Sequence, residues 1–233
     1  MNNHINEIYK TTNSCDLIII DSNDIHNVKY KFLDEHGYIG SSNFHNIKLG
    51  HVRNPFQRDS FGGYNGVGIY NGKEYDFIRS RWKNIIIRAN ADKSFYKNYR
   101  GDKFYYNNTI VCEEWMCYNT FAEWFMNIME PLNKSVKYDI DKDLKYPFYK
   151  DQYNLCHVYN PLTVSILPHS INVLLEGNAL QRGFKSKSID ELAKVIKDEA
   201  TMYANIGALY CDIYMILMEM DFEWFFRESG IIF

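Results

Sequence analysis

The sequence predicts an α+β fold with short antiparallel strands and several helices, and two kinds of apolar pattern support this class. Compact or alternating apolar runs at residues 17–20 and 28–33 are typical of short strands. Apolar residues recurring every three to four positions at residues 78–88 and 113–129 are typical of helices that pack on a core. With 233 residues, 46% of them hydrophobic, the chain can bury one substantial core or two smaller ones.

Sequence character divides the chain into three regions. Residues 1–77 form a β-rich N-terminal unit that contains a basic, glycine-rich segment. Residues 78–177 form a middle region, and residues 178–233 form a C-terminal helical segment. The obvious linker between the last two regions is the polar stretch at residues 178–187.

The glycine-rich segment at residues 51–77 predicts tight turns between short strands. Glycine tolerates the positive φ angles that such turns require, and five glycines occur there, at 62, 63, 66, 68 and 72. Between the glycines, the expected strand residues are Val67, Ile69, Tyr75 and Phe77. The segment is not a P-loop, because no Gly-Lys-Ser/Thr follows at the required spacing.

Two helices are predicted in the middle region. The first spans residues 78–88, and its expected buried face contains Ile78, Trp82, Ile85 and Ile86. After a polar, tyrosine-rich loop at residues 90–108, the second spans residues 113–129 and ends before Pro131, which cannot continue a helix. Three aromatic residues of this second helix are assigned to the core: Trp115, Phe121 and Trp124.

Further helices are expected toward the C-terminus. A short helix is predicted after Pro168, since proline is favoured where a helix begins. Ser188 and Glu191 match the capping-box pattern and predict a helix that begins near Ile189. The strongly apolar stretch at residues 203–220 is expected to pack on a neighbouring helix.

Charge is distributed unevenly along the chain, although the net charge is only −3. Residues 29–103 contain 14 Lys and Arg against 7 Asp and Glu, whereas residues 104–233 contain 11 against 18. A basic segment on an acidic protein is what a local phosphate-contacting surface requires. The alternative is simple segregation of solvent-exposed charge.

The N-terminus lacks the basic and apolar regions of a signal peptide, and no apolar run is long enough to cross a membrane. We therefore expect a cytoplasmic protein whose five scattered cysteines, Cys15, Cys112, Cys117, Cys156 and Cys211, are reduced. A zinc site at Cys112, Cys117, Cys156 and His157 has enough donors but loose spacing. Cysteine packed as a small apolar residue is the favoured interpretation.

Six motifs occur in an order that resembles a known group of proteins. They read NIKLGHVRNPF, GGYNGVGIY, RWKNIIIRAN, TIVCEEWMCYNTFAEWF, YDIDKDL and YNPLTVSILPHSINVLL. Together they resemble phage and prophage proteins described as HNH endonuclease-like, over residues 46–175. Three positions depart from the pattern: Ala89 and Asn90 follow Arg88 where that group has Cys-Tyr, and Val164 replaces a cysteine.

The resemblance implies a metal-dependent centre that hydrolyses DNA phosphodiester bonds, in an HNH-like middle and C-terminal region. The candidate catalytic residues are Asp141, Asp143, His157 and Asn172, although neither His157 nor His169 occupies a recognisable HNH histidine position. Asp141 and Asp143 are also the candidate Mg²⁺ ligands, because side chains at i and i+2 of a strand point to one face. The alternative is a structural turn in which these carboxylates accept backbone N–H bonds.

Contacts to DNA are expected from the basic segment and from the helix at residues 78–88. Phosphate contacts require flexible cations, and tyrosines such as Tyr64, Tyr70 and Tyr75 lie between them and can stack on bases. We expect Arg88 and Trp82 to hold the helix against the core instead. The candidate DNA-contacting residues are Lys48, Arg53, Asn54, Arg58, Arg79, Arg81 and Lys83.

Two functions of different classes are consistent with these patterns. The first is an HNH endonuclease-like DNA-binding protein, which nicks DNA with Mg²⁺ or binds it without cleavage because its catalytic pattern is degenerate. The alternative is a non-enzymatic phage inhibitor that binds and blocks a host defence protein, such as a CRISPR effector. The acidic C-terminal half favours the inhibitor, since an acidic face can occupy a nucleic-acid groove. Both functions place the protein in the cytoplasm of a bacterial host cell.

Overall fold

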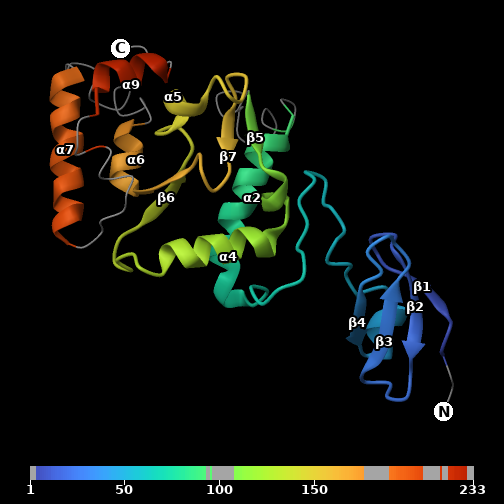
Figure 1. Cartoon of the computed structure of the whole chain (residues 1–233). Helices are drawn as coiled ribbons and strands as arrows, with labels where there is room; N and C mark the ends of the chain where they lie inside the picture. Colours follow the sequence, from blue (N-terminus) through green and yellow to red (C-terminus); the bar gives the residue numbers. More distant parts are fainter. Residues whose placement is uncertain are drawn as a thin grey trace. The chain divides into compact units, whose positions relative to one another are not determined.

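The computed structural model describes residues 4–92, 95, 108–175, 189–206, 216 and 220–229 (Figure 1). It confirms the α+β class. The chain divides into two compact units, the first made of Met1–Asn71 with Cys117–Asn119 and the second of Gly72–Met116 with Thr120–Phe233. The division into sequence regions at 77 and 177 stays a prediction.

The first unit is built on a four-stranded antiparallel sheet (Figure 1). Its alternation is clearest in β3, where Val28, Tyr30 and Phe32 are buried and the two intervening lysines are exposed. The strands predicted at residues 17–20 and 28–33 are thereby confirmed. In spatial order the strands are β1 (Ile8–Lys10), β2 (Asp16–Asp21), β3 (Val28–Phe32) and β4 (Ile39–Ser42), followed along the chain by α1 (Phe44–Lys48).

The strands predicted in the glycine-rich segment are wrong. Val67 and Ile69 are 61% and 78% exposed and lie in turns. Asn119 binds this segment instead: its Nδ2 donates to the carbonyl of Asn65 at 2.8 Å, and its Oδ1 accepts the N–H of Tyr70 at 3.2 Å. A side chain thus bonds backbone groups that a strand ladder would otherwise pair.

Gly66 lies in a turn that requires glycine. Its φ is 68°, and a Cβ there would lie 2.2 Å from Sγ of Cys117. Farther along, Tyr75 ends a 3₁₀ helix, η1 (Lys73–Tyr75), and Phe77 lies in the helix that follows. Neither residue is therefore in a strand.

The second unit begins with the predicted first helix, α2 (Asp76–Asn90), whose buried residues are the predicted Ile78, Trp82, Ile85 and Ile86. The predicted second helix is present as α4 (Tyr118–Met129), preceded by a 3₁₀ turn, η3 (Glu113–Met116). Trp115 and Phe121 are buried as predicted, and Trp124 is partly buried against them. The indole N–H of Trp82 donates to the carbonyl of Trp115 at 2.7 Å, which joins α2 to η3.

Two strand pairs lie in the remainder of this unit. β6 (Tyr138–Asp141) pairs antiparallel with β8 (Ser165–Pro168). β5 (Thr109–Val111) pairs parallel with β7 (His157–Tyr159), so the expectation of antiparallel strands does not extend to every pair.

The C-terminal helices share one hydrophobic core with the end of the middle region. Figure 1 shows α7 beside α6, and a single cluster of buried residues connects α6, α7 and α9. The predicted helix after Pro168 is confirmed as α6, and the helix from Ile189 as α7. The bounds are α5 (Tyr146–Tyr149), α6 (His169–Leu175), α7 (Ile189–Asn205) and α9 (Phe222–Glu228).

Several expectations fall on residues that the structure does not describe. These are the linker at 178–187, the cap residue Ser188, Cys211 and most of the loop at 90–108. Of the apolar stretch at 203–220, the described residues Tyr203, Ile216 and Met220 pack in the core shared by α6, α7 and α9. Within the described ranges, no helix is both long and apolar enough to cross a membrane.

Replacing Trp82 by phenylalanine should lower the free energy of unfolding by about 1 to 3 kcal/mol. The substitution removes a buried N–H donor and leaves a small cavity beside Trp115. Urea denaturation followed by far-ultraviolet circular dichroism measures the change. Leu162→Ala is the control, because Leu162 is 82% exposed, and its effect should stay within about 0.5 kcal/mol. Equal stability of the two variants would contradict this role of the hydrogen bond.

Candidate functional site

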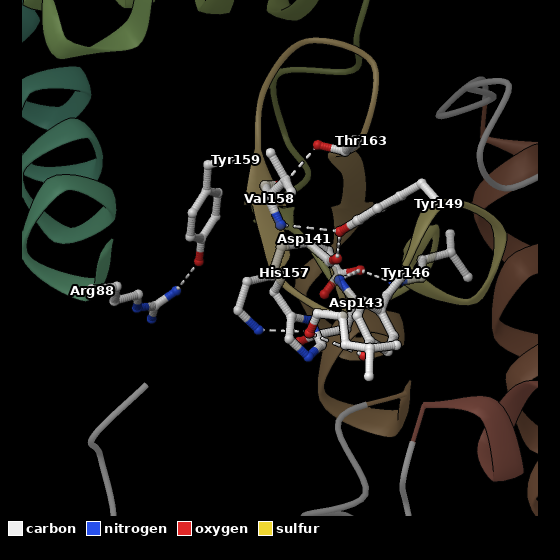
Figure 2. A network of polar contacts seen from close by, with 12 residues as sticks. Arg88, Asp141, Asp143, Tyr146, Tyr149, His157, Val158, Tyr159 and Thr163 are labelled. Carbon is white, nitrogen blue, oxygen red and sulfur yellow. Dashed lines mark hydrogen bonds and ion pairs between the residues drawn. The ribbon is translucent and has the colours of Figure 1, made fainter. Parts of the chain in front are cut away.

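A cluster of charged and aromatic side chains lies where β6 ends and β7 begins (Figure 2). We call Asp141, Lys142, Asp143, His157 and Tyr146 the β6–β7 cluster. Asp141 is the last residue of β6, His157 is the first of β7, and Tyr146 begins α5. The structure therefore brings together three of the four predicted catalytic residues.

Asp141 forms a turn at the end of β6. Its side chain is buried, with 4% of the residue exposed, and Oδ1 accepts the backbone N–H groups of Asp143 at 3.1 Å and Leu144 at 2.6 Å. This is the structural turn that the sequence left open as an alternative. Burial, with the nearby carboxylate of Asp143, raises the pKa of Asp141 to about 7.

Asp143 is the partner of two cationic or potentially cationic groups. Its Oδ1 lies 2.6 Å from Nζ of Lys142 and 2.8 Å from Nδ1 of His157. Burial opposes ionisation, but the ammonium of Lys142 and the ring of His157 hold the pKa of Asp143 well below its ordinary value. Burial also acts to lower the pKa of Lys142, and the Asp143 carboxylate reverses this and raises that pKa above the usual range.

His157 has a defined ring orientation. Its imidazole stacks on Tyr146, with ring centroids 3.9 Å apart and planes 12° apart. Nδ1 lies 2.8 Å from Oδ1 of Asp143 without the geometry of a hydrogen bond, so the contact is one of charge proximity. A carboxylate at this distance favours a proton on Nδ1, which in the neutral ring leaves Nε2 as the proton acceptor. The side chain is 24% exposed, so water reaches this part of the cluster.

Tyr149 ties the loop that contains Lys142 to β7. Its hydroxyl donates to the carbonyl of Lys142 at 2.8 Å and accepts the N–H of Val158 at 3.3 Å. On the other side of β7, a guanidinium N–H of Arg88 donates to the hydroxyl of Tyr159 at 3.0 Å (Figure 2). This contact agrees with the expected role of Arg88 in holding α2 against the core.

Asn172, the fourth predicted catalytic residue, belongs to a different cluster. Its Nδ2 donates to Oδ2 of Asp139 at 3.2 Å, and the same oxygen lies 2.5 Å from Nδ1 of His169. Asp139 lies in β6, whereas His169 and Asn172 both lie in α6. The structure thus contains a second Asp–His pair, and Asn172 lies there.

The bonding of Asp141 and Asp143 does not fit a shared Mg²⁺ site. Only Asp141 lies in β6, so the two side chains do not share the face of one strand. Asp141 uses Oδ1 for the turn, and Asp143 has an ammonium at 2.6 Å that would repel a cation. Among the described residues, no group of three or more His, Cys, Asp and Glu is arranged to hold a metal ion. The Mg²⁺ requirement stays a prediction.

The cysteines considered for zinc belong to different units. Cys117 contacts the carbonyl of Asn65 in the first unit, whereas Cys112 and Cys156 belong to the second. Burial raises the pKa of Cys112 to about 11, which disfavours the thiolate that zinc requires.

The candidate DNA contacts are divided between the two units. In the first unit Lys48, Arg53 and Arg58 are exposed. Asn54 is instead buried, with its Nδ2 donating to Oδ2 of Asp34 at 2.5 Å and its Oδ1 accepting the N–H of Phe56. Asn54 therefore bonds within the protein in this structure.

On α2, Lys83 is exposed and Arg79 is half-buried. Arg81 donates to the carbonyls of Phe77 at 3.3 Å and Tyr138 at 3.5 Å, and its guanidinium lies 5.8 Å from the ring centroids of Phe77 and Phe125. Arg81 therefore packs α2 against α4 and β6, which leaves Lys83 as the most accessible of the predicted cations on this helix.

Comparison with protein-family models, curated proteins and solved structures finds no match. The site is therefore described by its own geometry. Sequence reasoning missed the roles of Tyr146, Tyr149 and Asp139. The aromatic residues of the YPFY segment were the available signal, since helical spacing places Tyr146 and Tyr149 on one side of a turn.

Asp141→Asn should change how stability depends on pH. Because the pKa of the buried carboxyl is raised, the folded protein keeps a proton on Asp141 between pH 4 and 7, whereas the unfolded chain has already released it. The wild-type protein therefore loses stability as pH rises through this range. Asparagine keeps the accepting Oδ1 of the turn but does not ionise, so the variant should gain stability relative to wild type, on the order of 2 kcal/mol, from pH 4.5 to 7.5.

Urea denaturation at several pH values, with Asp151→Asn as an exposed-carboxylate control, tests this expectation. A difference between Asp141→Asn and wild type that stays constant with pH would show that Asp141 is ionised throughout.

Proposed function

We propose that the protein hydrolyses phosphodiester bonds of DNA with His157 as the general base and Asp143 as its positioning residue. The observation behind this proposal is the 2.8 Å contact between His157 Nδ1 and Asp143 Oδ1. A carboxylate this close to Nδ1 favours a proton on that nitrogen, which leaves Nε2 as the proton acceptor, and its charge stabilises the imidazolium that forms when the base takes a proton. The resemblance to HNH endonuclease-like proteins supports the choice of substrate.

The chemistry assigned to the cluster is the activation of water. His157 Nε2 removes a proton from a water molecule, whose oxygen then forms a bond to phosphorus. The ester P–O bond breaks, and the departing oxygen takes a proton from solvent. Stacking on Tyr146 restricts rotation of the imidazole, so that the base is oriented before substrate arrives. No step of this proposal passes through Asp141, which forms the turn.

Binding of the DNA backbone is assigned to the exposed cations. Lys83 is available on α2 in the same unit, while Lys48, Arg53 and Arg58 are available in the first unit. Contacts to phosphate from such side chains supply affinity that depends on salt and not on base sequence.

His157→Ala should lower the rate of supercoiled-plasmid nicking about 100-fold or more, because removing a general base costs that much. Asp143→Asn should lower it less, because the imidazolium that forms in the reaction loses its neighbouring carboxylate. Assays with Mg²⁺ and with EDTA measure the predicted metal requirement in the same experiment.

His169→Ala is the matched control, since His169 also bonds a carboxylate through Nδ1 but lies at the start of α6. Its nicking rate should stay within about threefold of wild type. Circular dichroism confirms that each variant is folded. If folded wild-type protein does not nick DNA, or if His157→Ala nicks as fast as His169→Ala, the proposed general base is refuted.

A further inference from the structure

A group of neighbouring aromatic rings lies in the first unit, whereas the β6–β7 cluster belongs to the second. The rings of His36 and Phe56 are stacked, with centroids 4.4 Å apart and planes 22° apart. Phe56 lies 6.3 Å from Tyr64, and the guanidinium of Arg58 lies 5.2 Å from the centroid of the Tyr64 ring. We call these four side chains the ring stack.

The ring stack is not part of the hydrophobic core of this unit. That core consists of β2, β3 and neighbouring aliphatic residues, with Tyr38 and Phe44 packed at its edge. His36 and Arg58 are exposed, and Phe56 and Tyr64 are half-buried. His36 covers one face of Phe56, and Tyr38 contacts the same ring edge-on. The His36 side chain is 45% exposed, so part of this aromatic surface is open to another planar group.

Hydrogen bonds between two loops hold the rings in place. The Asp34 carboxylate accepts from Nδ2 of Asn54 at 2.5 Å and from the N–H of Gly37 at 3.0 Å. Asn54 Oδ1 in turn accepts the N–H of Phe56 at 3.0 Å. These bonds fix the loop that contains Phe56 against the turn that contains His36, so the ring faces are arranged before any ligand binds.

One cation contacts a ring of this group, and a second lies near the residue that follows His36. Arg58 lies over Tyr64, and the side chain of Lys31 runs beside Gly37, where an added Cβ would lie 3.0 Å from its Cε. Of the nearby carboxylates, Asp34 bonds Asn54 and Gly37, and Asp59 accepts the N–H groups of its own turn. The Glu35 side chain is 88% exposed, and its carboxylate lies 3.6 Å from His36. Among the described bonds of these three acids, Glu35 accepts none from a backbone or amide N–H.

We propose that the ring stack binds single-stranded nucleic acid, with unpaired bases stacking on His36 and Phe56 and phosphates contacting Lys31 and Arg58. Aromatic rings flanked by cations match the alternation of bases and phosphates along a single strand. A duplex does not fit, because its bases are already stacked and paired. The inference shares Arg58 with the phosphate contacts proposed above, but it goes beyond the proposed hydrolysis because it assigns base stacking to these rings and a single-stranded ligand that nicking of plasmid DNA does not require.

Phe56→Leu in the full-length protein is the decisive substitution, because leucine keeps apolar volume in the loop and removes the ring. The probe is a fluorescein-labelled oligothymidylate of about 12 nucleotides, and fluorescence anisotropy measures its Kd. We expect Phe56→Leu to weaken binding about 10-fold and His36→Ala about 5-fold, since one base–aromatic stack accounts for changes of this size. Ile8→Ala is the control, because Ile8 is an aliphatic residue of β1 in the same unit and is 62% exposed. This substitution should leave the Kd unchanged.

A duplex of the same length is the second probe. Binding of the duplex should be weaker than that of the single strand and insensitive to Phe56→Leu. Equal Kd values for single strand and duplex, or an unchanged Kd in folded Phe56→Leu, would overturn the inference. His157→Ala is measured in parallel and should bind oligothymidylate like wild type, so failure of the hydrolysis proposal and failure of this one give different results.

Discussion

The ion pair between Lys142 and Asp143 is the contact around which the β6–β7 cluster is arranged. Lys142 is nearly buried, and a buried ammonium without a partner costs several kcal/mol of folding free energy. Asp143 must therefore follow β6 in a turn that returns its carboxylate to the lysine, and Asp141 forms that turn. The same carboxylate then determines where the ring of His157 lies, which places the start of β7 beside the end of β6.

Contacts farther out support this arrangement. Tyr149 connects the backbone of Lys142 to Val158, so α5 covers the ion pair. Arg88 reaches the hydroxyl of Tyr159 from α2 and thereby joins the predicted first helix to β7. The His157 ring is thus positioned by elements from three parts of the sequence. The stacked Tyr146 covers one face of the ring, and 24% of the side chain remains exposed.

Much of the fold could be predicted because apolar periodicity is a local property. The buried faces of α2 and β3 follow directly from the spacing of their apolar residues. The strand prediction for the glycine-rich segment is wrong because backbone groups of this segment bond to Asn119, about 50 residues away in the chain. No local pattern identifies so distant a partner.

The candidate site shows the same limit. Asp141 and Asp143 were identified from the motif, but the sequence left their bonding open between a turn and a metal site. Whether a carboxylate contacts a backbone N–H depends on where the strand ends, and β6 ends at Asp141. His157 could be named as a candidate but not paired with Asp143, because the contact joins the turn after β6 to the first residue of β7, and no local pattern shows that these segments meet. The burial of Asn54 likewise depends on Asp34, which lies in another loop.

The fold alone does not account for the composition of the β6–β7 cluster. Asp141 makes the turn without help from its neighbours, and an apolar side chain at 142 would pack in the same place without the cost of burying a charge. Lys142 and Asp143 together cost desolvation energy that apolar residues of similar size would avoid. What the pair adds is an ionised carboxylate, held at 2.8 Å from an imidazole that water can reach. An oriented and partly exposed histidine is of use to proton transfer, and it contributes little to packing. The turn requires only Asp141, but the cluster also contains a paired carboxylate and a partly exposed imidazole. For this physical reason we propose the chemistry for His157 and Asp143 and the structural role for Asp141.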